Sequence, residues 1–194
     1  MKALQDAWSP TVRKVSIALS ELFGMEIYVK PDPLQTVKPE EMIELLELDS
    51  STVISAVSKI SGDFNGYLLL LISPEYANEL LDIIFQHYLE NDVIDLSSDI
   101  KADIVKEVAN IVVGNLVSEI CNVTSKKVSY TIPEVVYDFL SALIDVICID
   151  LAMKRCDATM IKMRVIMRNE ELPVRLLILM AEQGGQGVEA CSCV

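Results

Sequence analysis

The chain of 194 residues contains the same order of predicted secondary-structure elements twice. In each half a helix precedes a strand, a proline ends that strand, and a second helix and a pair of strands follow. A shift of 101 positions places Leu19 on Ile120 and Ile27 on Val128. This repeat predicts two related α/β halves that are joined into one sheet. The predicted helices span residues 3–23, 39–48, 73–88, 99–121 and 134–155, and the predicted strands span residues 25–30, 52–60, 64–72, 127–132, 159–168 and 174–180.

Some boundaries leave an alternative open. Pro10 lies inside the first predicted helix, so the regular helix is expected to begin there, in a first turn that tolerates proline. The β-branched residues of 144–149 also allow a strand. The last two strands are expected to join through a turn at residues 169–173. We expect one domain over residues 1–182, with half-repeats of about 1–90 and 97–182, and a disordered tail over residues 183–194.

The composition excludes several classes of function. The 29 acidic and 16 basic residues give a formal net charge of −13. An acidic surface repels a phosphate backbone, so we expect no binding to nucleic acid. No apolar run reaches the roughly 20 residues of a membrane-spanning helix, and the first residues lack the pattern of a secretory signal. The expected location is therefore the cytoplasm, without a membrane segment.

The histidine and cysteine content restricts the chemistry further. His87 is the only histidine, which argues against a histidine-based triad or a multi-histidine metal site. The five cysteines are an odd number and are expected to be reduced thiols. Cys191 and Cys193 lack the usual spacing of metal ligands, and their role stays open. We expect no metal site.

The longest predicted helix, with Ser98 as its cap, carries a polar stripe. At 3.6 residues per turn, Asp103, Glu107, Asn110 and Gly114 lie on one side, while the valines of this segment lie elsewhere. Gly114 costs the helix about 1 kcal/mol relative to alanine, and it removes a side chain at a place where another molecule could approach. Periodicity by itself indicates only a solvated face.

The same residues resemble a known signature. The spacing Asp103-x3-Glu107-x2-Asn110-x22-Pro133 is similar to that of the CheC/CheX/FliY family of chemotaxis phosphatases. Residues 106–115, KEVANIVVGN, and residues 61–66, SGDFNG, also resemble words of that family, as does the stretch after Pro133. The resemblance extends over roughly residues 5–181. It implies an α+β fold in which two long helices pack on a mainly antiparallel sheet of about six strands.

The resemblance also implies an activity, the hydrolysis of the aspartyl phosphate of a CheY-type response regulator. Carried over by position, Glu107 would pair with a lysine of the docked regulator, and Asn110 would orient the attacking water. Asp103, Gly114 and Pro133 are expected to support this face. A neutral amide can hold a water molecule without repelling the phosphate. No cofactor of the chain's own is expected, since the regulator supplies Mg²⁺.

Many CheC-type members carry a second set of active residues in the first half. The corresponding positions here are Asp6 and Ser9. Asp6 is one methylene short, Ser9 lacks the amide, and Pro31 and Pro33 miss the expected proline position by one residue. We therefore expect a single working site and a degenerate first site.

Two alternative functions come from the same resemblance. The chain could be a non-catalytic scaffold like the middle domain of the flagellar protein FliM, although that domain lacks the Glu and Asn pair that this sequence retains. It could also be an adaptor that binds a CheD-type deamidase. An exposed edge strand could form a homodimer, but the sequence does not identify that strand.

Overall fold

The computed structural model describes residues 2–38, 41–46, 52–88, 98–153 and 158–181. The predicted tail over residues 183–194, with Cys191 and Cys193, lies outside the described residues. The helices are α1 (Lys2–Phe23), α2 (Met42–Leu46), α3 (Pro74–Tyr88), α4 (Ser98–Thr124) and α5 (Leu140–Met153). The strands are β1 (Ile27–Pro31), β2 (Gln35–Val37), β3 (Thr52–Gly62), β4 (Asn65–Ile72), β5 (Val128–Tyr130), β6 (Glu134–Phe139), β7 (Ala158–Met167) and β8 (Glu170–Ala181).

All strands pair antiparallel in one sheet. Its main path is β1-β7-β8-β4-β3-β5, while the short β2 pairs with β7 and β6 pairs with β3. The first strands of each half therefore pair with the hairpin of the other half, and β4 and β8 meet at the centre. The predicted fold class, two long helices on a mainly antiparallel sheet of about six strands, is confirmed.

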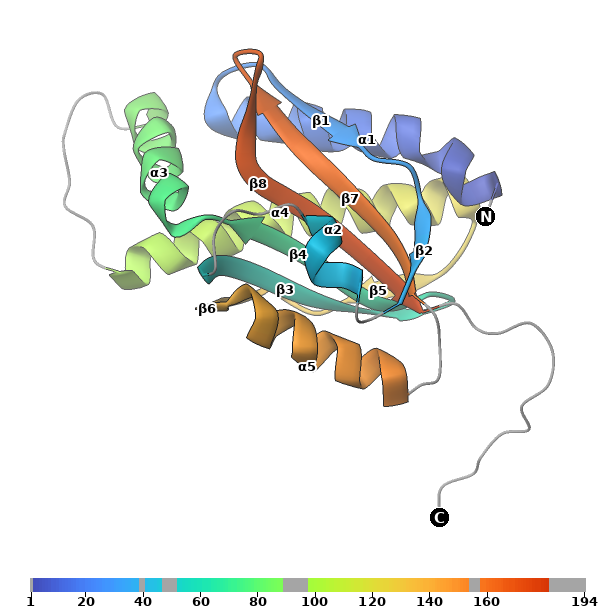
Figure 1. The fold of residues 1–194 in the computed structure, drawn as a ribbon. Coiled ribbons are helices and arrows are strands. Elements are labelled where there is room, and N and C mark those ends of the chain that lie inside the picture. Colours follow the sequence, from blue (N-terminus) through green and yellow to red (C-terminus); the bar gives the residue numbers. More distant parts are fainter. Residues whose placement is uncertain (1, 39–40, 47–51, 89–97, 154–157, 182–194) are drawn as a thin grey trace, which may run out of the picture.

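The helices cover both faces of the sheet. Figure 1 shows the long helices α1 and α4 on one face and α2 and α5 on the other. β8 alternates accordingly, because Leu176 and Ile178 belong to the core under α1 and α4, whereas Leu177 and Leu179 belong to the core under α2 and α5. A strand buried on both faces reads as a continuous apolar run, which is the pattern of this segment.

α4 is the helix that carries the polar stripe. Its buried side includes Val105, Val108, Val112 and Leu116, all at most 5% exposed. The helix ends at Thr124, and the following Ser125 has a φ of 54°, a left-handed conformation that commonly follows a helix. The predicted helix over residues 99–121 is thus correct within three residues at its end.

The predicted helix over residues 134–155 is wrong in its first part. Residues Glu134–Phe139 form β6, which pairs with β3 from Thr52↔Phe139 to Val57↔Glu134. Aromatic and β-branched side chains suit an edge strand, and the apparent helical spacing of Val136 and Phe139 coincided with this preference. The alternative of a strand at residues 144–149 is also wrong, because α5 covers them.

Two other boundaries differ from the predictions. α1 runs through Pro10 instead of beginning there, since an internal proline removes one backbone donor without preventing the preceding turns. The turn between β7 and β8 is Arg168 and Asn169, with φ values of 52° and 65°. Two successive residues with positive φ form the tight turn that suits a twisted hairpin. Pro173 lies within β8, beside an irregularity in the pairing with β7.

Among the described residues, no helix is both long and apolar enough to cross a bilayer.

Candidate functional site

The structure brings four predicted residues together on one stripe of α4. Asp103 and Glu107 are exposed, and Asn110 and Gly114 are partly buried. Val108 and Ala109, between them in sequence, are at most 5% exposed and belong to the core. The stripe therefore separates the buried side of α4 from solvent.

The polar side chains of this stripe have no partners within the described part of the chain. Asp103, Glu107 and Asn110 take part in no hydrogen bond or ion pair there. The next residue after Gly114, Asn115, does have a partner, because its amide donates to the carbonyl of Ile111 over 2.8 Å. A free carboxylate and a free amide one turn apart can both be used by another molecule.

The side chain of Tyr130, in β5, packs over Gly114. The Tyr130 hydroxyl lies 3.2 Å from the position that a β-carbon would take at Gly114. The space over this glycine was expected to admit another molecule, but a side chain of the same chain fills it. Spacing along the sequence gave no sign of Tyr130, because the contact depends on how β5 folds back along α4.

Pro133 lies between two pieces of edge strand. The register with β3 is Ile60↔Tyr130 in β5 and Val57↔Glu134 in β6, so three residues of this segment lie opposite two of β3. A proline fits such an irregularity, since it has no backbone N–H to contribute. Pro133 is buried and shapes the chain beside α4.

The motif at residues 61–66 anchors the end of α4 to the sheet. The backbone N–H of Lys127 donates to Asp63 Oδ2 over 2.8 Å, and the N–H of Asp63 donates to the carbonyl of Lys127 over 2.9 Å. A β-carbon at Gly66 would lie 1.8 Å from the carbonyl oxygen of Leu179, so only glycine fits there. These contacts position α4 and contribute no reacting group.

A carboxylate near the C-terminal end of α4 has a structural role instead. Glu119 is 8% exposed and pairs with the ammonium of Lys14 in α1. The hydrogen bond from Lys14 lowers the pKa of Glu119, and a weaker one from Asn122 adds to this, against the effect of burial. This pair joins the two long helices on the side away from the stripe.

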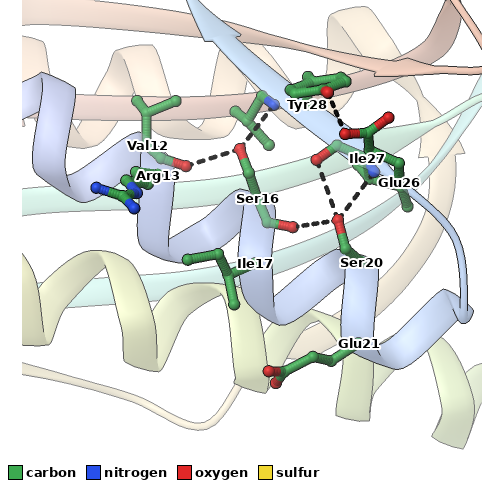
Figure 2. A pocket seen from close by; sticks show the side chains of 10 residues that line it. Val12, Arg13, Ser16, Ile17, Ser20, Glu21, Glu26, Ile27 and Tyr28 are labelled. Carbon is green, nitrogen blue, oxygen red and sulfur yellow. Dashed lines mark hydrogen bonds between the residues drawn. The ribbon is translucent and has the colours of Figure 1, made fainter.

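The first half has a groove between α1 and β1, the elements that correspond to α4 and β5 in the second half. Arg13, Ser16, Ser20 and Tyr28 are among the residues that line this groove between α1 and β1 (Figure 2). Asp6 and Ser9, the predicted degenerate set, lie in α1 before this groove, and their side chains lie outside the described residues.

Serine side chains close the outer edge of β1. The N–H of Val29 donates to Ser16 Oγ and the N–H of Ile27 donates to Ser20 Oγ, each over 2.9 Å (Figure 2). The repeat places Cys121 at the position of Ser20, and its thiol approaches the carbonyl of Val128 at 3.8 Å. Because Val117 corresponds to Ser16, the second half lacks the other hydroxyl.

The described residues contain no group of three or more His, Cys, Asp or Glu side chains arranged to hold a metal ion.

The fold is similar to those of solved FliY, FliM and CheX structures. It is similar to Thermotoga maritima FliY, with a TM-score of 0.61 at 11% identity over 88% of this chain and 84% of that one. It is also similar to FliM in the FliG–FliM complex from H. pylori, with a TM-score of 0.64 at 13% identity over 93% and 91%. The CheX–CheY–BeF3–Mg²⁺ complex from Borrelia burgdorferi matches with a TM-score of 0.58 at 15% identity over 90% and 97%. Identities this low show a shared fold.

The family model that matches this chain is that of Chemotaxis phosphatase CheX, over residues 54–143. The matched region is slightly less than half of the chain, and it contains the whole stripe of α4, Tyr130 and Pro133. Asp6 and Ser9 lie outside it. Together with the structural neighbours, this match confirms the resemblance to the CheC/CheX/FliY family.

Proposed function

We propose that this protein is a phosphatase that accelerates hydrolysis of the aspartyl phosphate of a CheY-type response regulator, in chemotaxis or a related two-component pathway of the cytoplasm. The observation that carries the proposal is the pair of Glu107 and Asn110. Neither side chain has a hydrogen bond or an ion pair among the described residues, the two lie one turn apart on α4, and the CheX family match includes them.

The residue types suit a reaction in which most of the chemistry belongs to the partner. An acyl phosphate is already reactive, and the regulator holds both the phosphorylated aspartate and the Mg²⁺. Asn110 orients the attacking water, because its amide can bind a water molecule without adding negative charge beside the phosphate. Glu107 pairs with a lysine of the regulator and fixes α4 over the phosphorylated pocket. Asp103, Gly114 and Pro133 support this face.

The first test measures phosphate release from phosphorylated CheY-type regulators with and without the protein. We expect acceleration over the regulator's own decay for at least one regulator. Glu107→Ala should weaken regulator binding and turnover, whereas Glu79→Ala, an exposed carboxylate on α3, should change neither. A wild type that accelerates no regulator in a broad panel would refute the proposed activity.

The alternative function is that of a non-catalytic interaction protein. The structural similarity to FliM in its complex with FliG supports this alternative, and the same assay tests it. Such a protein would bind partners through the same fold without shortening the lifetime of the phosphoryl group. Binding of a CheD-type deamidase is a further partner proposal from the resemblance. A pull-down with such a deamidase tests it, and this binding is compatible with phosphatase activity.

We also propose where a second copy would pair. β6 lies at the edge of the sheet beside β3, and the N–H of its last residue, Phe139, donates to Asp138 Oδ1 over 2.7 Å. Tyr137 and Phe139 of β6 are 65% and 58% exposed. A homodimer formed by sheet extension would therefore use β6, and Tyr137→Lys should dissociate it in sedimentation velocity. A dimer unaffected by this substitution would place the interface elsewhere.

A further inference from the structure

Tyr130 is a polar residue beside the α4 stripe that the sequence motif does not contain. Its hydroxyl lies 3.2 Å from the position that a β-carbon of Gly114 would take, and the residue is 39% exposed. The β-carbons of residues four apart on a helix are about 5–6 Å from each other. The Tyr130 hydroxyl therefore contacts α4 one helical turn beyond Asn110. The stripe thus continues from Asp103, Glu107 and Asn110 to a phenol supplied by β5.

The Tyr130 hydroxyl has both a donor and an acceptor available. Within the described part of the chain it forms no hydrogen bond, although Gly114 leaves it close against the helix. The neighbouring Asn115 amide is bonded to its own helix and cannot serve the stripe in the same way. Tyr130 therefore offers a hydroxyl to a molecule that is bound over the stripe.

An ordered water molecule needs two to four polar partners to have a fixed position and orientation. In the proposed reaction, Glu107 is occupied by the lysine of the regulator, which leaves one amide of this chain for the attacking water. A single amide fixes one hydrogen bond but leaves the water free to rotate about it. A second group from the same rigid surface would remove that freedom.

We infer that the Tyr130 hydroxyl is a positioning group of the hydrolytic site, which acts with Asn110 to hold the attacking water. This inference rests on the proposed phosphatase function. It explains why Gly114 stands in the interior of a long helix, since a β-carbon there would press on the hydroxyl at 3.2 Å.

The test compares Tyr130→Phe with the wild type in single-turnover dephosphorylation at saturating and at limiting concentrations. Loss of the hydroxyl alone should lower the maximal rate by about tenfold, because the water keeps its hydrogen bond to Asn110 but loses a second one, and it should leave the Kd for the regulator within about twofold. Tyr28→Phe removes an exposed hydroxyl from β1, at the other end of the strand path, and is the matched control, with no expected change.

A second pair of variants tests the role of Gly114. Gly114→Ala should lower the maximal rate by displacing the hydroxyl, and it should have almost no further effect in the Tyr130→Phe background. Full activity of Tyr130→Phe with an active wild type would overturn the inference and leave the proposed function intact. An inactive wild type would instead refute the proposed function. A loss confined to regulator binding would make Tyr130 a docking residue and would also overturn the inference.

Discussion

The backbone N–H of Val29 in β1 donates a hydrogen bond of 2.9 Å to the hydroxyl of Ser16 in α1. Ser16 also donates to the carbonyl of Val12 over 2.9 Å, so one hydroxyl joins the helix to the edge of the sheet. Edge strands with free N–H groups invite pairing with other chains. The first half of the molecule is closed in this way, whereas the second half carries Val117, which has no hydroxyl, at the position that corresponds to Ser16.

This relationship predicts a loss of stability for Ser16→Ala. The substitution leaves the half-buried N–H of Val29 without its partner, which should lower the free energy of unfolding by about 1–2 kcal/mol. The matched control is Ser61→Ala, which removes an exposed hydroxyl that contacts Ser129, and should cost less than about 0.5 kcal/mol. Urea denaturation measures both. Equal effects of the two substitutions would contradict the account of the closed edge.

Two glycines should respond in opposite ways to alanine. Gly66→Ala places a β-carbon 1.8 Å from the Leu179 carbonyl oxygen across β4 and β8, and we expect a loss of about 3 kcal/mol or more. Gly114→Ala meets only the movable Tyr130 hydroxyl, while alanine favours the helix by about 1 kcal/mol. The Gly114→Ala protein should therefore be at least as stable as the wild type in thermal unfolding. If Gly66→Ala is also as stable as the wild type, β4 and β8 are less tightly packed at Gly66 than described.

The pair of Lys14 and Glu119 predicts a specific pH dependence. The pKa of Glu119 is lowered in the folded state, chiefly by the hydrogen bond from Lys14. The unfolded state therefore takes up a proton first on acidification, and this stabilisation, complete above about pH 4.5, is lost as the pH falls through the lowered folded value. The stability difference between the wild type and Glu119→Gln should shrink across that range. Denaturation of both proteins at several pH values measures this difference. A difference that stays constant with pH would show that the ionised pair of Lys14 and Glu119 does not stabilise the fold.

The sequence was sufficient for the elements whose pattern is local. The stripe of α4 and its buried valines follow from helical periodicity, and the hairpin of β3 and β4 follows from its alternation around Gly62. The repeated element order also predicted that both halves contribute to one sheet. The stripe and the hairpin depend on residues that are close to one another in the sequence.

The features that the sequence did not predict depend on contacts between distant segments. β6 is a strand because β3 offers it a pairing edge, and its residues alone also fit a helical pattern. Tyr130 reaches Gly114 only because β5 turns back along α4. For the same reason the motif identified Asn110 and Glu107 but not the hydroxyl beside them.

Asn110 is the residue on which the proposed hydrolysis depends most, and one measurement tests its role most directly. The rate of dephosphorylation of a saturating, stably binding CheY-type regulator is compared among the wild type, Asn110→Ala and Asn115→Ala. Asn115 is an amide of the same helix that is bonded to Ile111, so its substitution should leave the rate within about twofold. Asn110→Ala should bind the regulator but lower the rate by about 100-fold, because the water then loses the amide that orients it. A rate for Asn110→Ala equal to that of the wild type would contradict the account.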